Sequence, residues 1–380
     1  MSNLLMITDG NIERSGICNF MLQWIKGIRS SYGFDCQITV YFRKGVKDQS
    51  MKEEYEAQNV AIVCGEIPDE GSSLNAAYRK KNREDIASIL REQKFDIVHV
   101  NSSAIGYTSI ALRESKKARV PIRISHAHGR NIDGKIKQLY HMLLRSYTRF
   151  AATVYAGCSA DSGLYMFGKA GINSSKWHFV PNTVDAQKYA YNDDNRMACR
   201  KALKLSENDL LIGAVGYLEE IKNHTFLLDV IASLKQMGKK ATLIIFGEGT
   251  LRPVLEKKAE EMGIADQVIL FGNTDQVYKW LSAVDCYVMP SLSEGLPIAA
   301  VEAQANGLNC LLSDGVPHDV DLSKDVYHLA TDKGPEPWVK QILQLPKKTK
   351  EERLSGVENV CKAGFGKESL PSYVRDLYQS

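Results

Sequence analysis

Two glutamates and the start of a helix lie close together in the segment MPSLSEGLPIAAVEAQANG, residues 289–307. A short apolar strand is expected to end near Met289, and Pro297 has the fixed backbone dihedral angle that suits the first turn of a helix. Glu294 would then lie in the loop before this helix, and Glu302 about one and a half turns inside it.

The chemistry that suits this segment is binding of a ligand that carries both phosphates and hydroxyls. Backbone N–H groups near Gly295 and Leu296, at the start of a helix, offer a site for an anion such as a diphosphate. A carboxylate accepts hydrogen bonds from two hydroxyls at once, as neighbouring sugar hydroxyls provide. Two glutamates beside an anion site therefore favour a ligand with both groups. The alternative is a solvated loop glutamate and a surface helical one.

A cation for the same ligand is available in the segment IGAVGYLEEIKNHTFLLDVI, residues 212–231. A buried strand is expected to end at Gly216, and Lys222 and Asn223 fall in the loop before the next helix. Because ligands of parallel sheets bind at the carboxyl ends of the strands, we expect Lys222 on the same edge as Glu294. A lysine offers a full charge and three donors to a phosphate, although a lone loop lysine is usually just solvated.

These loops need a parallel sheet to position them, and each half of the chain predicts one. Short apolar runs alternate with amphipathic helical stretches throughout, which is typical of strands covered by helices on both faces. The polar stretch 186–209 lacks a strand and is the expected linkage between two doubly wound α/β domains. Two Rossmann-like domains facing each other across a cleft are the expected architecture.

Length and composition agree with a globular protein of two domains. The chain has 380 residues, of which 44% are hydrophobic and 24% charged. We expect no membrane span and no secretory signal, because no apolar run is long enough. The eight cysteines are scattered and none has zinc-site spacing, which favours buried thiols in a reducing compartment. No Asp-x-Asp pair lies at a strand end near the expected site, so a metal-held diphosphate is not expected.

Charge is unevenly distributed between the two halves. Residues 1–185 contain 25 Lys and Arg against 18 Asp and Glu, and residues 186–380 contain 23 against 27, for an overall net charge of +3. Residues 135–149 are predicted to form an amphipathic helix with an apolar stripe that includes Leu143 and a basic second face. The stripe fits either the core of the domain or an anionic membrane surface with a lipid-linked acceptor.

The order of several motifs resembles that of the retaining family 4 glycosyltransferases, which have the GT-B fold. Glu294 and Glu302 have the family's spacing, and similar motifs cover most of the chain: GICNFMLQW, PIRISHAHG, GCSADSGLYMFG, VPNTVD, VGYLEEIKNH, LIIFGEG, VILFGNTDQV, PSLSEGLP and LLSDGVPHDVD. Within this family, the motifs most resemble those of the EpsF-like group of bacterial exopolysaccharide and capsule glycosyltransferases. The resemblance implies an acceptor-binding domain over 1–190, a nucleotide-sugar domain over 191–365, and a final helix, 366–380, that returns to the first domain.

The resemblance also implies roles for single residues. Glu294 would contact the donor sugar, Glu302 the ribose, and Lys222 the leaving diphosphate, while His126, or else His128, would lie at the reacting centre. The implied catalytic residues are His126, Glu294 and Lys222. The other implied donor-binding residues are Gly16, Tyr217, Asn223, Gly247, Gly272, Asn273, Gly295, Leu296 and Glu302. The implied acceptor-side residues are His128 and Arg130.

Two positions depart from the family pattern. Tyr217 stands where the family usually has arginine, which removes a positive charge from the diphosphate site. The segment LLSDGVPHDVD lacks a glutamate that related sequences often carry, and His318 stands near that place.

The implied function is retaining transfer of a hexose from a nucleotide-diphosphate donor, expected to be a UDP-sugar. The acceptor would be a saccharide or a lipid-linked saccharide of surface polysaccharide synthesis. The alternatives are a non-catalytic GT-B subunit that stabilises a partner transferase and a nucleotide-sugar epimerase. We expect a cytoplasmic protein, with peripheral contact at the inner face of the membrane as an option. No cofactor, no metal and no nucleic-acid partner are expected.

Overall fold

A computed structural model of the chain describes residues 2–31, 35–65, 76–129 and 135–379, with side chains from residue 140 onward in the last range. The chain forms two compact units, one of residues 1–183 and 368–380 and the other of residues 184–367. The division after residue 183 falls seven residues before the expected boundary, because Val184 already pairs with Gly366 in the second unit.

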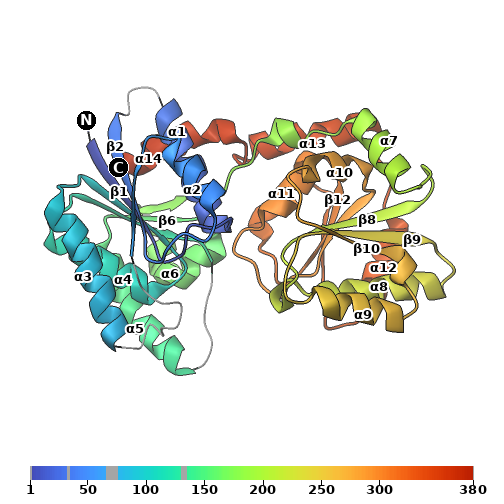
Figure 1. The fold of residues 1–380 in the computed structure, drawn as a ribbon, viewed down its shortest axis with the longest axis horizontal. Helices are drawn as coiled ribbons and strands as arrows, with labels where there is room; N and C mark the ends of the chain where they lie inside the picture. The colour runs from blue at the N-terminus through green and yellow to red at the C-terminus, as the bar shows by residue number, and fades with distance from the viewer. Residues whose placement is uncertain (1, 32–34, 66–75, 130–134, 380) are drawn as a thin grey trace. The chain divides into compact units, whose positions relative to one another are not determined.

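The first unit is a parallel sheet in the order β3-β2-β1-β4-β5-β6-β7 (Figure 1). Its central strand is apolar on both faces: Leu4 and Met6 join one buried cluster, and Leu5 and Ile7 join another. The strands are β1 (Ser2–Thr8), β2 (Cys36–Phe42), β3 (Ala61–Cys64), β4 (Ile97–Ser102), β5 (Ile122–Ala127), β6 (Val154–Gly157) and β7 (Trp177–Phe179). The helices are α1 (Gly16–Ser30), α2 (Gln49–Glu56), α3 (Ala76–Glu92), α4 (Ile105–Lys117), α5 (Lys135–Ala151), α6 (Ala160–Ile172) and α14 (Leu370–Tyr378).

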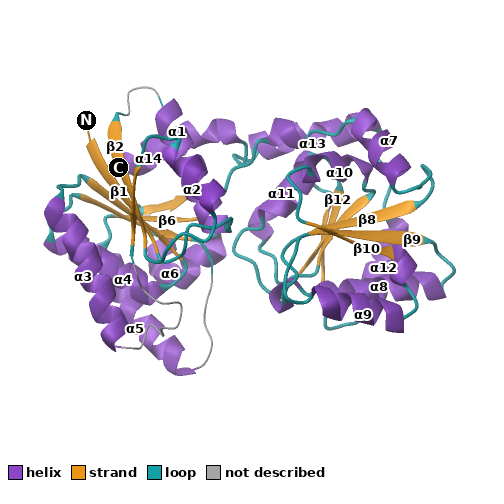
Figure 2. Ribbon diagram, viewed as in Figure 1, coloured by secondary structure: helices purple, strands orange, loops and turns teal. Residues whose placement is uncertain are grey.

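The second unit is a parallel sheet in the order β10-β9-β8-β11-β12-β13. Its strands are β8 (Leu210–Val215), β9 (Ala241–Phe246), β10 (Val268–Gly272), β11 (Cys286–Met289), β12 (Asn309–Ser313) and β13 (Val326–Leu329). Its helices are α7 (Asp193–Ala202), α8 (His224–Gln236), α9 (Arg252–Glu261), α10 (Val277–Ala283), α11 (Ile298–Ala305), α12 (Glu336–Gln344) and α13 (Lys350–Lys362). Short 3₁₀ turns are η1 (Ala186–Tyr189), η2 (Glu220–Lys222), η3 (Ala265–Gln267), η4 (His318–Val320) and η5 (Lys367–Ser369), the last of which spans the boundary of the two units. In both units, helices cover the two faces of the sheet (Figure 2).

The strand order locates the place where a ligand can bind in each unit. In both sheets the first strand lies in the middle, and the direction of winding reverses beside it, between β1 and β4 and between β8 and β11. Loops leave the carboxyl ends of two neighbouring strands in opposite directions at this point, so they leave a crevice. In the second unit these are the loops that carry Lys222 and Glu294.

The C-terminal helix α14 packs on α1 within the first unit. The indole N–H of Trp24 donates a 2.7 Å hydrogen bond to the hydroxyl of Tyr378, and both side chains are buried. The last residues of the chain therefore complete the core of the unit that begins with the first residues.

The helix expected over 135–149 is α5, and its buried face agrees with the predicted stripe in part. His141 and Thr148 are buried, and the Thr148 hydroxyl hydrogen-bonds with that of Ser109 on α4 at 2.9 Å. Leu143, which the stripe placed with the buried residues, is 68% exposed. Leu144 and Tyr147 of the stripe pack against a buried cluster of the first unit, so apolar and small polar contacts together hold this end of α5 on the domain. The side chains of residues 135–139 lie outside the described part.

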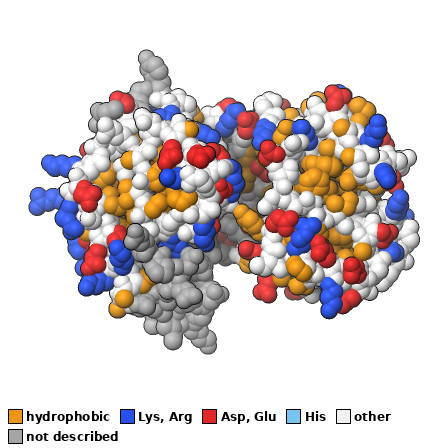
Figure 3. Space-filling model, viewed as in Figure 1, with side chains coloured by type: hydrophobic (Ala, Val, Ile, Leu, Met, Phe, Trp, Pro, Cys, Tyr) orange, Lys and Arg blue, Asp and Glu red, His pale blue; other side chains and the backbone are white. Residues whose placement is uncertain are grey.

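Basic side chains of the first unit gather at the edge where α3 lies (Figure 3). No helix among the described residues is long and apolar enough to cross a bilayer.

Candidate active site

Two loops at the carboxyl edge of the second sheet are joined by hydrogen bonds. Asn223 follows η2 and has a left-handed backbone (φ 53°), which turns the chain directly into α8. Its side-chain amide donates to the carbonyl of Pro290 at 3.2 Å, and the N–H of Leu292 donates to the carbonyl of Ile221 at 2.8 Å. The loop after β8 and the loop after β11 therefore form one wall.

The structure brings Lys222 and Glu294 together on this wall. The ammonium group of Lys222 lies 2.6 Å from a carboxylate oxygen of Glu294, and the side chains are only 22% and 10% exposed. The backbone N–H of Glu294 is held by the carbonyl of Gly315 at 2.9 Å. In this state the two charges neutralise one another. A diphosphate that takes the ammonium group would release the carboxylate to accept hydrogen bonds from hydroxyls.

Glu302 lies on the next element, in the second turn of α11, and its protonation is unusual. Burial raises the pKa of this carboxyl to about 7, against the opposing effects of a hydrogen bond with Tyr189 and of the charge of Lys188. Tyr189 lies in η1, which packs on α11. The backbone carbonyl of Tyr189 accepts a 2.8 Å hydrogen bond from the side-chain amide of Asn306. No pattern in the sequence singles out Tyr189, because it lies in the polar stretch 186–209 that was expected to link the two domains.

The loop residues that lead into α11 lie where the anion site was expected, but the helix begins later. Its first residue is Ile298, so Gly295 and Leu296 precede it by two or three positions. Leu296 is buried and Gly295 half-buried. The N–H groups of the first turn of α11, together with this loop, face the edge that carries Lys222.

Two glycines close the neighbouring part of the edge, where the nucleoside was expected. Gly247 has φ 143°, and a Cβ atom there would lie 2.1 Å from the carbonyl oxygen of Gly216, so a side chain cannot be accommodated. Its N–H donates to the carbonyl of Gly272, which itself has φ 86°. Asn273, the next residue, is exposed. Tyr217, in the loop after β8, is 49% exposed and supplies no positive charge there.

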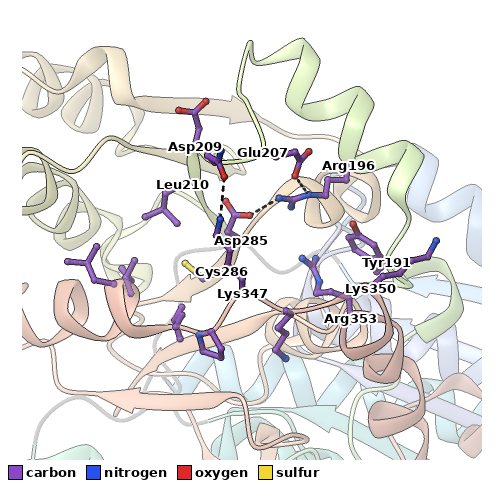
Figure 4. A pocket seen from close by; sticks show the side chains of 16 residues that line it. Tyr191, Arg196, Glu207, Asp209, Leu210, Asp285, Cys286, Lys347, Lys350 and Arg353 are labelled. Atoms are coloured by element: carbon purple, nitrogen blue, oxygen red, sulfur yellow. Dashed lines mark hydrogen bonds and ion pairs between the residues drawn. The ribbon is translucent and has the colours of Figure 1, made fainter.

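A cavity of about 550 Å³ in the same unit lies at the opposite edge of the sheet (Figure 4). It is lined by Leu210 and Cys286, the first residues of β8 and β11. Arg196 in its wall pairs with Asp285 at 3.0 Å and with Glu207 at 2.9 Å. The charge of Arg196 is therefore used in structural ion pairs, and none of the predicted donor-site residues lines the cavity.

In the first unit, Gly16 is the first residue of α1, directly after the N-cap Ser15, whose hydroxyl accepts from the N–H of Cys18 at 3.3 Å. Gly16 is exposed, and a Cβ atom there would meet nothing within 4 Å. Packing within the protein therefore does not require a glycine at this position. The open space before the helix start agrees with the close approach of a ligand.

His126, the implied catalytic histidine, lies in β5 with its side chain 1% exposed. It continues a buried chain of hydrogen bonds from Tyr378 to His99 (3.0 Å) and from His99 to His126 (3.1 Å). The indole N–H of Trp24 donates to the same Tyr378 hydroxyl, so four buried side chains are linked in series. Burial, with the neighbouring histidines, lowers the pKa of His126 well below its usual range.

The side chain of His126 is thus buried, and the structure does not place it at an open edge of the sheet. His128 lies one residue beyond the end of β5, is half-buried, and stacks on His126 with 4.3 Å between ring centroids. Its Nε2 lies 3.1 Å from the side-chain oxygen of Asn101, whose amide nitrogen donates to the carbonyl of His99.

This contact fixes the form of His128. Asn101 accepts at its oxygen, so His128 carries its proton on Nε2 and keeps a lone pair on Nδ1. Burial lowers the pKa of His128 to about 3, which keeps the ring neutral. Of the two histidines, His128 is the less buried. Arg130 lies outside the described residues.

Both sheets have the strand order of nucleotide-binding α/β domains, and the second carries the Lys222–Glu294 pair at its switch point. Over the full length, the fold is similar to that of Anabaena Alr3699/HepE solved in complex with UDP (TM-score 0.78, 14% identity, all of both chains covered). The same protein in complex with UDP-glucose gives a TM-score of 0.75 at 15% identity, again over all of both chains. The class of fold is therefore GT-B, with two Rossmann-like domains.

Two family models match the sequence. The model described as Glycosyltransferase Family 4 matches residues 34–188, and the model described as Glycosyl transferases group 1 matches residues 195–357. The two matches follow one another along the chain and both models describe glycosyltransferases, so the chain belongs to the glycosyltransferases.

Curated relatives agree with this assignment. The putative glycosyltransferase EpsF of Bacillus subtilis (strain 168) is 30% identical over 259 residues, which are 67% of this chain and 66% of EpsF. The UDP-Gal:alpha-D-GlcNAc-diphosphoundecaprenol alpha-1,3-galactosyltransferase of Escherichia coli is 26% identical over 254 residues, which are 65% of each chain. The chain thus spans just under two thirds of the length of these relatives.

Proposed function

We propose that this protein transfers a sugar, with retention of configuration, from a UDP-sugar to a saccharide or lipid-linked acceptor in polysaccharide synthesis. The observation that carries the proposal is the 2.6 Å contact of Lys222 with Glu294 at the switch point of the second sheet. The solved complexes of Anabaena Alr3699/HepE contain UDP and UDP-glucose, and the E. coli relative is named for a UDP-Gal donor and a diphosphoundecaprenol acceptor.

The proposed reaction breaks the bond between the anomeric carbon and the diphosphate and forms a bond to the acceptor oxygen on the same face. Charge grows on the departing phosphate oxygen, where Lys222 stabilises it. That oxygen takes the proton of the acceptor hydroxyl, so no protein base is needed. Glu294 orients the sugar hydroxyls, Glu302 holds the ribose, and Gly247, Gly272 and Asn273 border the base. The first unit, with His128, is proposed to bind the acceptor.

The test supplies UDP-glucose or UDP-galactose with a polyprenyl-diphosphate saccharide and measures UDP release and the anomeric configuration of the product. A product that retains the donor configuration supports the proposal, provided that the Glu294→Ala variant no longer forms this product. A new sugar nucleotide formed from donor alone would show an epimerase instead. Absence of binding to every nucleotide sugar in isothermal titration would show a non-catalytic subunit.

Donor affinity is expected to depend on pH through Glu302. The pKa of its carboxyl is about 7 in the free protein, and only the carboxylate accepts hydrogen bonds from both ribose hydroxyls. The dissociation constant for a UDP-sugar should therefore be flat above pH 7 and rise by up to about tenfold per pH unit below it. Both phosphates of such a donor are esterified and do not titrate in this range, so the protein is the source of the change.

Titration calorimetry from pH 5.5 to 8.0 measures this dependence. Glu302→Gln should bind more weakly and without the pH dependence, whereas the exposed Glu261→Gln on α9 should behave like the parent protein. The same pH dependence in Glu302→Gln would show that another group is responsible.

Tyr217→Arg is expected to strengthen donor binding or turnover. A charge-assisted contact with a phosphate contributes about 1.5–3 kcal/mol, which corresponds to roughly 10–100-fold. Tyr217 is 49% exposed, so an arginine fits without repacking the core. Steady-state kinetics with Tyr217→Lys and Tyr217→Gln as companions separate charge from size; no gain in kcat/KM with either cation would contradict the expectation.

We further propose that α5 contacts an anionic membrane that carries the acceptor. Met142, Leu143 and Phe150 are 62%, 68% and 69% exposed, and the Lys116 ammonium lies 3.2 Å from the centroid of the Phe150 ring. Exposed apolar side chains beside cations suit the interface of an anionic bilayer.

Sedimentation with vesicles of anionic and of neutral lipid checks this prediction. The parent protein should bind the anionic vesicles, and the double substitution Met142→Ser with Leu143→Ser should reduce binding by about tenfold or more. Met237→Ser, an equally exposed methionine after α8 in the second unit, is the matched control. Equal binding by the double variant would contradict a role for α5.

A further inference from the structure

Two histidines and an aspartate meet on one side of the second unit, outside the residues assigned to the donor. His318 begins η4, Asp321 follows it, and His328 is in β13. Nδ1 of His318 lies 2.7 Å from one oxygen of Asp321, and Nε2 of His328 lies 2.8 Å from the other. The centroids of the two imidazole rings are 4.0 Å apart. One carboxylate therefore holds two imidazoles side by side, with their rings tilted by 42°.

This set of atoms has the composition and spacing of a transition-metal site. One ligand atom from each residue can be chosen so that all lie within 4.8 Å of one another. A zinc–nitrogen bond is about 2.0–2.1 Å long, so ligand atoms in a tetrahedral site are about 3.4 Å apart. The contraction needed is at most about 1.4 Å, and the His318 side chain, 77% exposed, can rotate to supply it without repacking.

We propose that His318, Asp321 and His328 bind a divalent transition-metal ion of the Zn²⁺, Ni²⁺ or Co²⁺ class. Two imidazoles with one carboxylate select these ions, whereas Mg²⁺ and Ca²⁺ prefer sites made only of oxygen. The ion takes the place of the hydrogens that the nitrogens share with the carboxylate, and water completes its coordination.

The expected affinity of the site for the metal ion depends on the surroundings of His328. Its second nitrogen, Nδ1, is buried and has no hydrogen-bond partner among the described residues. Metal-binding histidines usually donate this N–H to an acceptor, and loss of that contact costs about 10–100-fold in affinity. We therefore expect roughly micromolar binding rather than the tighter binding of an oriented site.

The position of the site connects it to the wall of the donor site. Residues 314–321 are hydrogen-bonded to α11 through Gln304, whose amide donates to the carbonyl of Val320 at 2.7 Å. The carbonyl of Gly315 holds the N–H of Glu294 at 2.9 Å. An ion shared between this segment and β13 fixes one end of that wall. It acts on stability and not on the transfer step, for which Lys222 supplies the charge.

Isothermal titration of the full chain with ZnCl₂, NiCl₂ and MgCl₂ tests the proposal without any donor present, so its outcome is independent of the proposed activity. We expect binding of Zn²⁺ and Ni²⁺ but not Mg²⁺, with a melting temperature raised by about 5–10 °C at a hundredfold excess over Kd. His318→Ala should weaken Zn²⁺ binding at least tenfold and remain folded, because the side chain is exposed. Asp321→Asn is the second variant.

Two controls separate this site from other ligands. His178→Ala, a half-buried histidine of β7 in the first unit, should bind Zn²⁺ like the parent protein. A Co²⁺ complex should lack the intense thiolate charge-transfer band that binding at the exposed Cys64 would give. Equal Zn²⁺ affinity in the parent and His318→Ala, a thiolate band, or no Zn²⁺ binding at millimolar concentration would each overturn the proposal.

Discussion

Replacing Lys222 with alanine is expected to lower kcat by about 10²–10³-fold and to weaken binding of the UDP-sugar. Its ammonium group lies beside Glu294. On the same wall, Tyr217 stands where related sequences usually have an arginine, so that position supplies no positive charge. The charge that develops on the departing diphosphate would then lose the cation that Lys222 supplies. Single-turnover kinetics and donor titration measure the two effects separately.

The Lys222→Ala variant also leaves the Glu294 carboxylate without its partner, so its kinetics are compared with those of control variants. Lys222→Arg retains the charge and should recover part of the turnover, and Lys222→Ala combined with Glu294→Gln removes the unpaired charge without restoring catalysis. Lys257→Ala removes a lysine that is 77% exposed on α9 and should change nothing. Turnover of Lys222→Ala within threefold of the parent protein would contradict the assigned role.

The adjacency of Lys222 and Glu294 could be derived from sequence because it depends on topology alone. Each follows an apolar strand of a parallel sheet, and the carboxyl ends of such strands share one edge. Seventy-two residues separate the two side chains, yet they lie 2.6 Å apart. The two-domain α/β fold was predictable for the same reason, since periodicity fixes the order of elements and the order limits the topology.

The details that the sequence did not reveal depend on contacts across long separations. Tyr189 reaches Glu302 because η1 packs on α11, and a polar stretch without a strand gives no sign of that packing. The burial of His126 depends on Tyr378, which closes the core through His99 from the far end of the chain. His318 and His328 become neighbours only when β13 pairs beside β12.

His128→Ala is expected to lower kcat by about 10²-fold, within the range for loss of a group at the reacting centre, with donor affinity little changed. Its ring is neutral, half-buried and held at Nε2 by Asn101, so Nδ1 is the atom that it offers to a substrate. His126→Ala should act differently. It empties a buried position between His99 and His128 and should lower the melting temperature, while kcat per folded molecule falls less.

Asn101→Ala distinguishes the positioning of His128 from a general loss of structure. Without the amide oxygen, the proton of His128 is free to occupy either nitrogen, so kcat should fall while the nitrogen NMR shifts of the ring report a mixture of tautomers. The neutral ring also predicts that kcat contains no ionisation of His128 between pH 5 and 8, because its pKa lies near 3. A larger loss of kcat in folded His126→Ala than in His128→Ala would reverse this assignment and require the buried ring to become accessible during the reaction.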